Sequence, residues 1–236
     1  FARKLNEFFE YVNKRLREEK LAQELLFIVD GMEKVATSAI RKKIVIDESE
    51  RIRQIKVNTI FTLPIELMSE TQRISQMNTV LPFPFVKIKE RNGADVPKAI
   101  ERFYEFVTKR IDEKLFDSPG TIRKAIQMCG GSPRELLRVL EYANLYAPDE
   151  VGKITEAALD KGLKKLAALT AQYVKPEEFL KLRQLKEDND KNLPTGTDES
   201  WQDLLEKLIV FEYNDGTYKR VNPVVELSEL YHRYAG

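Results

Sequence analysis

The sequence is poor in residues that cross-link proteins or bind transition metals. It has one cysteine, Cys129, and one histidine, His232, in 236 residues. A single cysteine cannot form an internal disulfide, and a histidine without neighbouring ligands does not make a zinc site. Apolar runs stay well below the roughly 20 residues that cross a bilayer. We therefore expect a cytoplasmic protein without a membrane partner, in which Cys129 is a packing residue.

The sequence also lacks an excess of charge of either sign. Its 39 lysines and arginines balance 38 aspartates and glutamates, which leaves a formal charge of +1. No global field therefore draws the chain to nucleic acids or acidic membranes, and any such binding must be local. There is no secretory signal at the amino end, and the first residue is Phe1 rather than methionine. We expect the beginning of the protein to be missing.

The amino-terminal part follows a helix, strand, helix, strand pattern. Apolar residues at helical spacing predict an amphipathic helix over 3–24. The runs 25–29 (LLFIV) and 57–64 (VNTIFTLP) have the length of strands, and the charged stretch 47–56 between them is typical of a helix. The lack of polar alternation in LLFIV predicts burial on both faces, as in a parallel sheet covered by helices. The expected fold class is therefore α/β.

Polar residues follow both predicted strands. Asp30 and Glu33 come after the first strand, and Thr62 ends the second. In open parallel sheets, ligands bind beyond the carboxyl ends of the strands. An acid there can hold Mg²⁺, and a nearby glutamate can orient water for attack on a terminal phosphate. Asp-Gly also suits ordinary turns, so an ordinary turn is the alternative interpretation.

The stretch 25–35 (LLFIVDGMEKV) resembles the Walker B region of P-loop NTPases. Its Asp-Gly-acid-Lys form is similar to that of the STAND and KAP-type branches. The resemblance implies that Asp30 binds Mg²⁺ and that Glu33 is the catalytic residue that polarises water. It also implies that Thr62 stands where AAA+ ATPases carry sensor 1, close to the terminal phosphate of ATP.

The middle of the chain is predicted to be helical. Helices are expected over 96–116 and 119–128, and another begins within 129–147 (CGGSPRELLRVLEYANLYA). There, two glycines close one helix, Ser132 caps the next, and a proline fits its first turn. The pattern GGxPRxLLR resembles the sensor 2 helix of AAA+ ATPases, which implies that Arg134 reaches bound nucleotide from a helical lid. The alternative is that Arg134 pairs with a neighbouring acid on the surface.

The carboxy-terminal part follows two more predicted helices, 153–173 and 176–188. The stretch 189–200 (NDKNLPTGTDES) has the composition of a linker. Next come a predicted helix over 200–208 and two strands joined by the Asn-Asp-Gly turn 214–216. This order resembles a winged helix.

A winged helix raises the question of DNA binding. Tyr218, Lys219 and Arg220 on the predicted hairpin could approach phosphates. The candidate recognition helix, however, carries Asp203 and Glu206 with a single lysine, and an acidic helix repels a phosphate backbone. We therefore expect a protein partner or a second copy of the chain in preference to DNA.

Together, these resemblances imply the carboxy-terminal part of a bacterial ATPase of the AAA+ or STAND type. It would comprise a partial P-loop NTPase core over 1–92, a helical lid over 93–188 and a winged-helix-like domain over 189–236. The phosphate-binding loop of the family, GxxxxGK followed by Ser or Thr, is absent from the sequence. We expect an ATP- and Mg²⁺-dependent switch whose present chain binds ATP poorly by itself. The alternatives are a non-enzymatic scaffold or DNA-binding adaptor that uses the winged helix, and an unrelated α/β protein.

Overall fold

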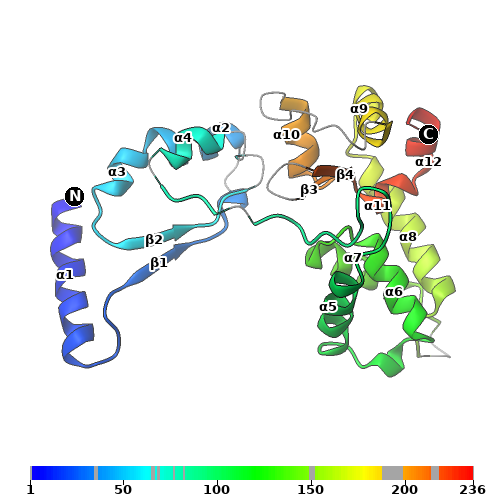
Figure 1. Ribbon diagram of the computed structural model, residues 1–236, viewed down its shortest axis with the longest axis horizontal. Coiled ribbons are helices and arrows are strands. Elements are labelled where there is room, and N and C mark those ends of the chain that lie inside the picture. Colours follow the sequence, from blue (N-terminus) through cyan, green and yellow to red (C-terminus); the bar gives the residue numbers. More distant parts are fainter. Residues whose placement is uncertain are drawn as a thin grey trace. The chain divides into compact units, whose positions relative to one another are not determined.

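The chain folds into two compact units, Phe1–Leu81 and Pro82–Gly236. Each unit contains helices and one pair of short strands in its described part, so the chain is mixed α/β as expected (Figure 1). The expected lid, 93–188, and the expected carboxy-terminal domain, 189–236, both fall in the second unit. The computed structural model describes residues 2–34, 37–64, 67, 70–76, 78–81, 83–148, 152–187, 199–213 and 218–235.

The first unit is built around a parallel strand pair. The helical segments between the two strands confirm the predicted strand, helix, strand unit, and β2 is shorter than the predicted run 57–64. β1 and β2 pair in parallel, with Leu26 opposite Asn58 and Val29 opposite Phe61. The described elements are α1 (Ala2–Glu18), β1 (Leu26–Val29), η1 (Met32–Lys34), α2 (Ser38–Lys42), η2 (Lys43–Asp47), α3 (Ser49–Arg53), β2 (Asn58–Phe61) and α4 (Thr71–Ser75).

The prediction that LLFIV is buried on both faces is wrong. Leu26, Phe27 and Ile28 are 54%, 42% and 65% exposed, and Ile60 of β2 is 50% exposed. Phe9 of α1 packs edge-on against Phe27, with 5.2 Å between the ring centroids. Among the described residues this sheet has only two strands, so most of its apolar surface faces solvent. Parallel strands are normally covered on both faces.

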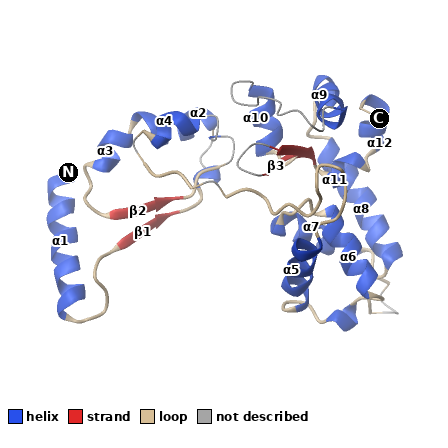
Figure 2. Cartoon of the chain, viewed as in Figure 1, coloured by secondary structure: helices blue, strands red, loops and turns tan. Residues whose placement is uncertain are grey.

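The second unit is mainly helical and carries one antiparallel strand pair (Figure 2). Its core includes Ile122, Leu136 and Leu159, all fully buried. Its described elements are α5 (Pro97–Thr108), η4 (Glu113–Leu115), α6 (Pro119–Met128), α7 (Pro133–Leu145), α8 (Glu156–Ala171), α9 (Pro176–Glu187), α10 (Glu199–Glu206), β3 (Val210–Tyr213), β4 (Tyr218–Val221), α11 (Pro223–Glu226) and α12 (Glu229–Tyr234).

The helix predicted over 96–116 is shorter than expected. α5 ends at Thr108, and a separate 3-10 turn, η4, follows at Glu113–Leu115. Asp112 caps that turn, because its side chain accepts a hydrogen bond from the Lys114 N–H at 3.0 Å. Aspartate is favoured at the N-cap of a helical turn and is unfavourable in the interior of a continuous helix. In the part of the chain described, no helix combines the length and apolar character needed to span a membrane.

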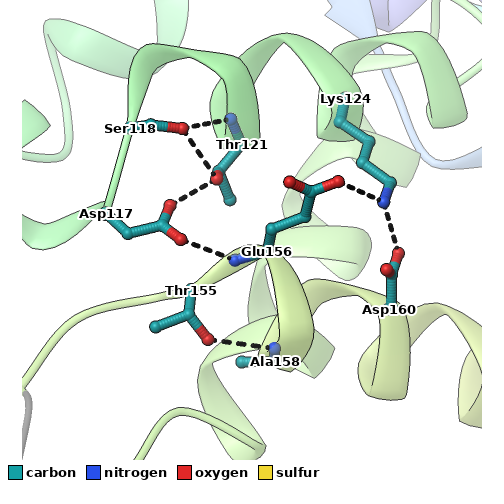
Figure 3. Close-up of polar contacts among 8 residues, drawn as sticks. All are labelled: Asp117, Ser118, Thr121, Lys124, Thr155, Glu156, Ala158 and Asp160. Carbon is teal, nitrogen blue, oxygen red and sulfur yellow. Dashed lines mark hydrogen bonds and ion pairs between the residues drawn. The ribbon is translucent and has the colours of Figure 1, made fainter.

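A polar network ties the start of α6 to the start of α8 (Figure 3). Ser118 caps α6, and its hydroxyl accepts from the Thr121 N–H at 3.3 Å. Asp117 bridges the two helices: it accepts from the Thr121 hydroxyl and, at 2.9 Å, from the Glu156 N–H at the start of α8. Lys124 of α6 adds a 2.8 Å ion pair to the Glu156 carboxylate. This cluster is explained by helix capping and packing rather than by a ligand.

We expect Asp117→Ala to lower the free energy of unfolding by about 1 kcal/mol, the usual cost of a lost cap. Burial raises the pKa of Asp117, but hydrogen bonds from Thr121 and from backbone N–H groups outweigh burial and the pKa is lowered. The stabilisation is therefore present above the unfolded pKa of about 4 and is lost as pH falls through the folded pKa. Urea unfolding at neutral and acid pH should show the difference from wild type shrinking in acid. A difference that does not change with pH would contradict the role of the carboxylate.

Candidate functional site

The predicted acid and hydroxyl meet at one edge of the parallel strand pair. Asp30 directly follows β1, and Thr62 directly follows β2. Val29 and Phe61 lie opposite each other at the ends of the two strands. The residues that follow them, Asp30 and Thr62, are therefore neighbours. The Thr62 N–H donates to the Val29 carbonyl at 3.0 Å, and the Thr62 hydroxyl donates to the Asp30 carboxylate. The structure therefore brings Asp30 and Thr62 together at the carboxyl ends of the strands.

The Asp30 carboxylate favours its charged form. The hydrogen bond from Thr62 is the largest cause that lowers the pKa of Asp30, followed by a hydrogen bond from the Gly31 backbone, while burial opposes them weakly. The nearby charge of Lys34 lowers the pKa slightly further. The carboxylate is also exposed. An ionised, accessible carboxylate of this kind is a suitable ligand for a hard cation such as Mg²⁺.

The described residues contain no closed metal cage. Among the residues described, no three His, Cys, Asp or Glu side chains gather into a metal-binding group. Mg²⁺ in nucleotide sites is commonly held by one or two carboxylates together with substrate phosphates and water. Asp30 is therefore the candidate Mg²⁺ ligand within the part of the chain that the structure describes.

Glu33 lies in the short turn that follows the acid–hydroxyl pair. It is the central residue of η1, which begins two residues after Asp30. Its side chain falls outside the described part of the structure. The role of Glu33 in polarising water stays a prediction.

Arg134 lies in the second unit, in the first turn of α7. Pro133 occupies the first helical position, and the Ser132 hydroxyl caps the helix by accepting from the Glu135 N–H at 3.3 Å, both as predicted. Arg134 is exposed and forms no ion pair with any residue in the described part of the chain. The buried Glu135 pairs instead with Arg138, at 2.9 Å. The alternative in which Arg134 is engaged by a neighbouring acid is therefore not observed.

The turn that leads into α7 is packed on two sides. Gly130 and Gly131 end α6 as predicted, with left-handed φ values of +58° and +81°. A Cβ atom on Gly131 would overlap the carbonyl of Val86, and one on Gly130 would overlap the ring of Phe211 on β3. The Tyr213 hydroxyl donates to the Gly130 carbonyl at 2.5 Å. The turn before Arg134 is thus held by the segment 83–88 and by the carboxy-terminal hairpin.

Sequence reasoning missed the residues that hold this turn. The Phe85 N–H donates to the Glu212 carbonyl of β3 at 3.3 Å, and its ring lies 4.9 Å from that of Phe211. The next residue, Val86, donates its N–H to the Gly131 carbonyl at 3.3 Å. The partners lie far apart in the sequence, so no local pattern marks their contact. The aromatic run 83–86 (FPFV) was the only available signal.

Two of the three hairpin residues that were considered as DNA contacts have little exposed side-chain surface. Lys219 lies opposite Glu212 in the antiparallel register, and the two side chains form a 3.1 Å ion pair in which each is 7% exposed. Tyr218 is also buried. Of the three residues considered as phosphate contacts, only Arg220 is partly exposed without a buried ion pair. Strand pairing therefore directs the Lys219 ammonium group to Glu212 within the hairpin.

The order of helix α10 and hairpin β3–β4 matches the prediction. The predicted turn 214–216 lies outside the described residues, as does almost all of the predicted linker 189–200. The winged-helix-like domain stays a prediction. In comparisons with protein families, with characterised proteins and with solved structures, nothing matches this chain.

Proposed function

We propose that this chain supplies the acidic sheet edge and the lid of an ATP-dependent molecular switch of the AAA+ or STAND type. The observation that carries the proposal is the hydrogen bond between Thr62 and Asp30 at the carboxyl ends of two parallel strands. Ligands of open parallel sheets bind at this edge. A charged carboxylate next to a hydroxyl suits a nucleotide that carries both a divalent cation and a terminal phosphate.

Each residue then has a distinct task. Asp30 would hold Mg²⁺, which neutralises charge on the phosphate oxygens, and the hydroxyl of Thr62 would contact the terminal phosphate. Glu33 would orient the attacking water. Arg134 would reach the phosphates from the lid, a task that suits a guanidinium because it stays charged and can form two hydrogen bonds with one phosphate. Its exposure and freedom from ion pairs among the described residues support this role.

The open faces of the first sheet support the same proposal. The side chains of Leu26, Ile28 and Ile60 are each at least half exposed. Parallel strands rich in such residues are normally inner strands of a larger, covered sheet. A P-loop NTPase core would provide further strands and helices for this surface, together with the phosphate-binding loop that this sequence lacks.

The packing around the Gly130–Gly131 turn supports a switch rather than a static site. The turn carries Arg134 at its end and touches Phe211 and Tyr213 of the hairpin. A displacement of Arg134 on nucleotide exchange would therefore be transmitted to the hairpin through direct contact. Interfaces packed this closely tend to move between discrete arrangements.

ATP turnover by the full-length protein tests the proposal. Glu33→Gln should leave ATP binding intact and slow phosphate release by roughly 10²–10⁴-fold, the usual contribution of a general base. Thr62→Val should also slow turnover, whereas the exposed Glu177→Gln of α9 should not. Unchanged turnover in Glu33→Gln would remove Glu33 from the mechanism. Micromolar ATP affinity for residues 1–236 alone would contradict the need for a separate phosphate-binding loop.

A further inference from the structure

The second unit contains a cleft of its own. It has a volume of about 240 Å³ and is lined by the turn 91–93, the end of α9, strand β4 and Glu226 of α11. This is smaller than the range of about 300–1,000 Å³ typical of sites for drug-sized ligands. The cleft can therefore take only a small molecule or one chemical group of a larger one.

Charge in the cleft is strongly one-sided. Among the described residues, Arg91, Lys186 and Arg220 line it together with one acid, Glu226. The formal charge of these four side chains is two positive, although the chain as a whole is almost neutral. A concave surface lined by one sign of charge concentrates ligands of the opposite sign.

The cationic groups are held in place by the fold. The turn that carries Arg91 is closed by hydrogen bonds from the Glu90 N–H to the Ala94 carbonyl at 2.8 Å and from the Gly93 N–H to the Glu90 carbonyl at 2.9 Å. The Arg91 guanidinium lies over the ring of Tyr218, 5.3 Å from its centroid. Tyr218 and Arg220 are two residues apart on β4, and strand alternation places them on one face.

Glu226 offsets only part of the positive charge of the basic residues that line the cleft. Burial raises the pKa of Glu226, while the charges of Arg220 and Lys186 only partly oppose burial. Arg220 forms no ion pair within the described part of the chain. The positive field of Arg220 and Lys186 is therefore only partly offset by Glu226 and attracts an incoming anion.

We propose that this cleft binds a small ligand that carries a phosphomonoester group. A phosphomonoester has a charge of about −1.5 to −2 at neutral pH, opposite in sign to the side chains of Lys186 and Arg220 that line the cleft. The Arg220 guanidinium provides planar donors that grip phosphate oxygens, and Lys186 adds a second positive charge. The proposal concerns residues of the second unit only and does not depend on ATP hydrolysis by the acid–hydroxyl site.

A nucleic-acid backbone fits the same cleft less well. Each phosphodiester carries one charge, and a duplex needs several cations spread along an exposed surface. Here Lys219, the neighbour of Arg220, is buried in its pair with Glu212. The positive charge is confined to a cavity, which favours a compact ligand.

Isothermal titration of residues 1–236 with ribose 5-phosphate tests this site. We expect saturable binding, weakened roughly 10- to 100-fold by Arg220→Gln and also weakened by Lys186→Gln, since each removes a charged partner of the phosphate. Glu226→Gln should tighten binding about three- to tenfold, because it removes the one negative charge. Arg102→Gln, which removes an exposed arginine of α5, is the matched control and should bind like wild type.

The opposite changes in affinity separate a binding role from a structural one. If Arg220 only stabilised the partly buried Glu226, both variants would lose stability and neither would gain affinity. Fluorescence of Trp201 confirms folding, and Lys186→Gln tests the site if Arg220→Gln does not fold. Absence of saturation at millimolar ligand, an equal loss in Arg102→Gln, or tighter binding of duplex DNA through the same residues would each overturn the proposal.

Discussion

Gly131→Ala is expected to destabilise the second unit by about 2–5 kcal/mol. A left-handed backbone costs an alanine roughly 1–2 kcal/mol, and Gly131 has a φ of +81°. Overpacking adds about 1–3 kcal/mol, because the new methyl group would overlap the backbone carbonyl of Val86. A backbone carbonyl cannot move aside as a flexible side chain can, so the segment 83–88 would have to shift away from the turn.

Chemical unfolding followed by tryptophan fluorescence measures this effect. Trp201 is the only tryptophan of the chain, lies in the second unit and is 6% exposed. Gly93→Ala is the matched control, since Gly93 has a φ of +84° but no atom within 4 Å of an added Cβ. It should lose only the backbone part, about 1–2 kcal/mol. Equal losses in the two variants would show that contact with Val86 does not constrain the turn.

Gly131→Ala should also change the position of Arg134, the residue that we propose contacts nucleotide. Gly131 precedes Ser132, which caps α7, and Arg134 lies in the first turn of that helix. A shift of the turn would move the guanidinium without removing it. If the proposed switch operates, Gly131→Ala should therefore slow ATP turnover by the full-length protein even where the second unit is still folded.

The parts of the site that the sequence predicted depend on local signals. Ser132, a following proline and two preceding glycines predicted the start of α7, and the structure confirms it. The neighbourhood of Asp30 and Thr62 followed from strand ends alone, because parallel strands place their carboxyl ends at one edge. Such features are determined within a few residues or by one pairing rule, so a single sequence reveals them.

The parts that the sequence did not predict depend on distant partners. LLFIV is apolar enough for a buried strand, but burial requires covering elements, and those described here leave it exposed. Phe85 meets Phe211, and Lys219 meets Glu212, only after the hairpin packs. The residues next to Lys219 in the sequence do not show that its cross-strand neighbour is a buried glutamate. The sequence therefore did not predict the ion pair between Lys219 and Glu212.

Lys219→Met is expected to cost about 3–5 kcal/mol, because it leaves the Glu212 carboxylate buried without its partner. The two side chains are directly opposite on β3 and β4, 3.1 Å apart and 7% exposed. Water cannot replace the lysine at such a site without opening the hairpin. The hairpin also holds the turn before Arg134, so its loosening should lower the stability of the second unit as a whole.

The double variant Lys219→Met with Glu212→Leu identifies the cause of this loss. A buried ion pair replaced by apolar side chains of similar size is often neutral in stability, so the double variant should recover most of the free energy. Arg102→Met is the control for an exposed pair, since Arg102 and Glu105 lie 3.0 Å apart with side chains 70% and 50% exposed. It should change stability by at most about 0.5 kcal/mol. A double variant less stable than Lys219→Met would show that the pair contributes through specific geometry rather than through compensation of a buried charge.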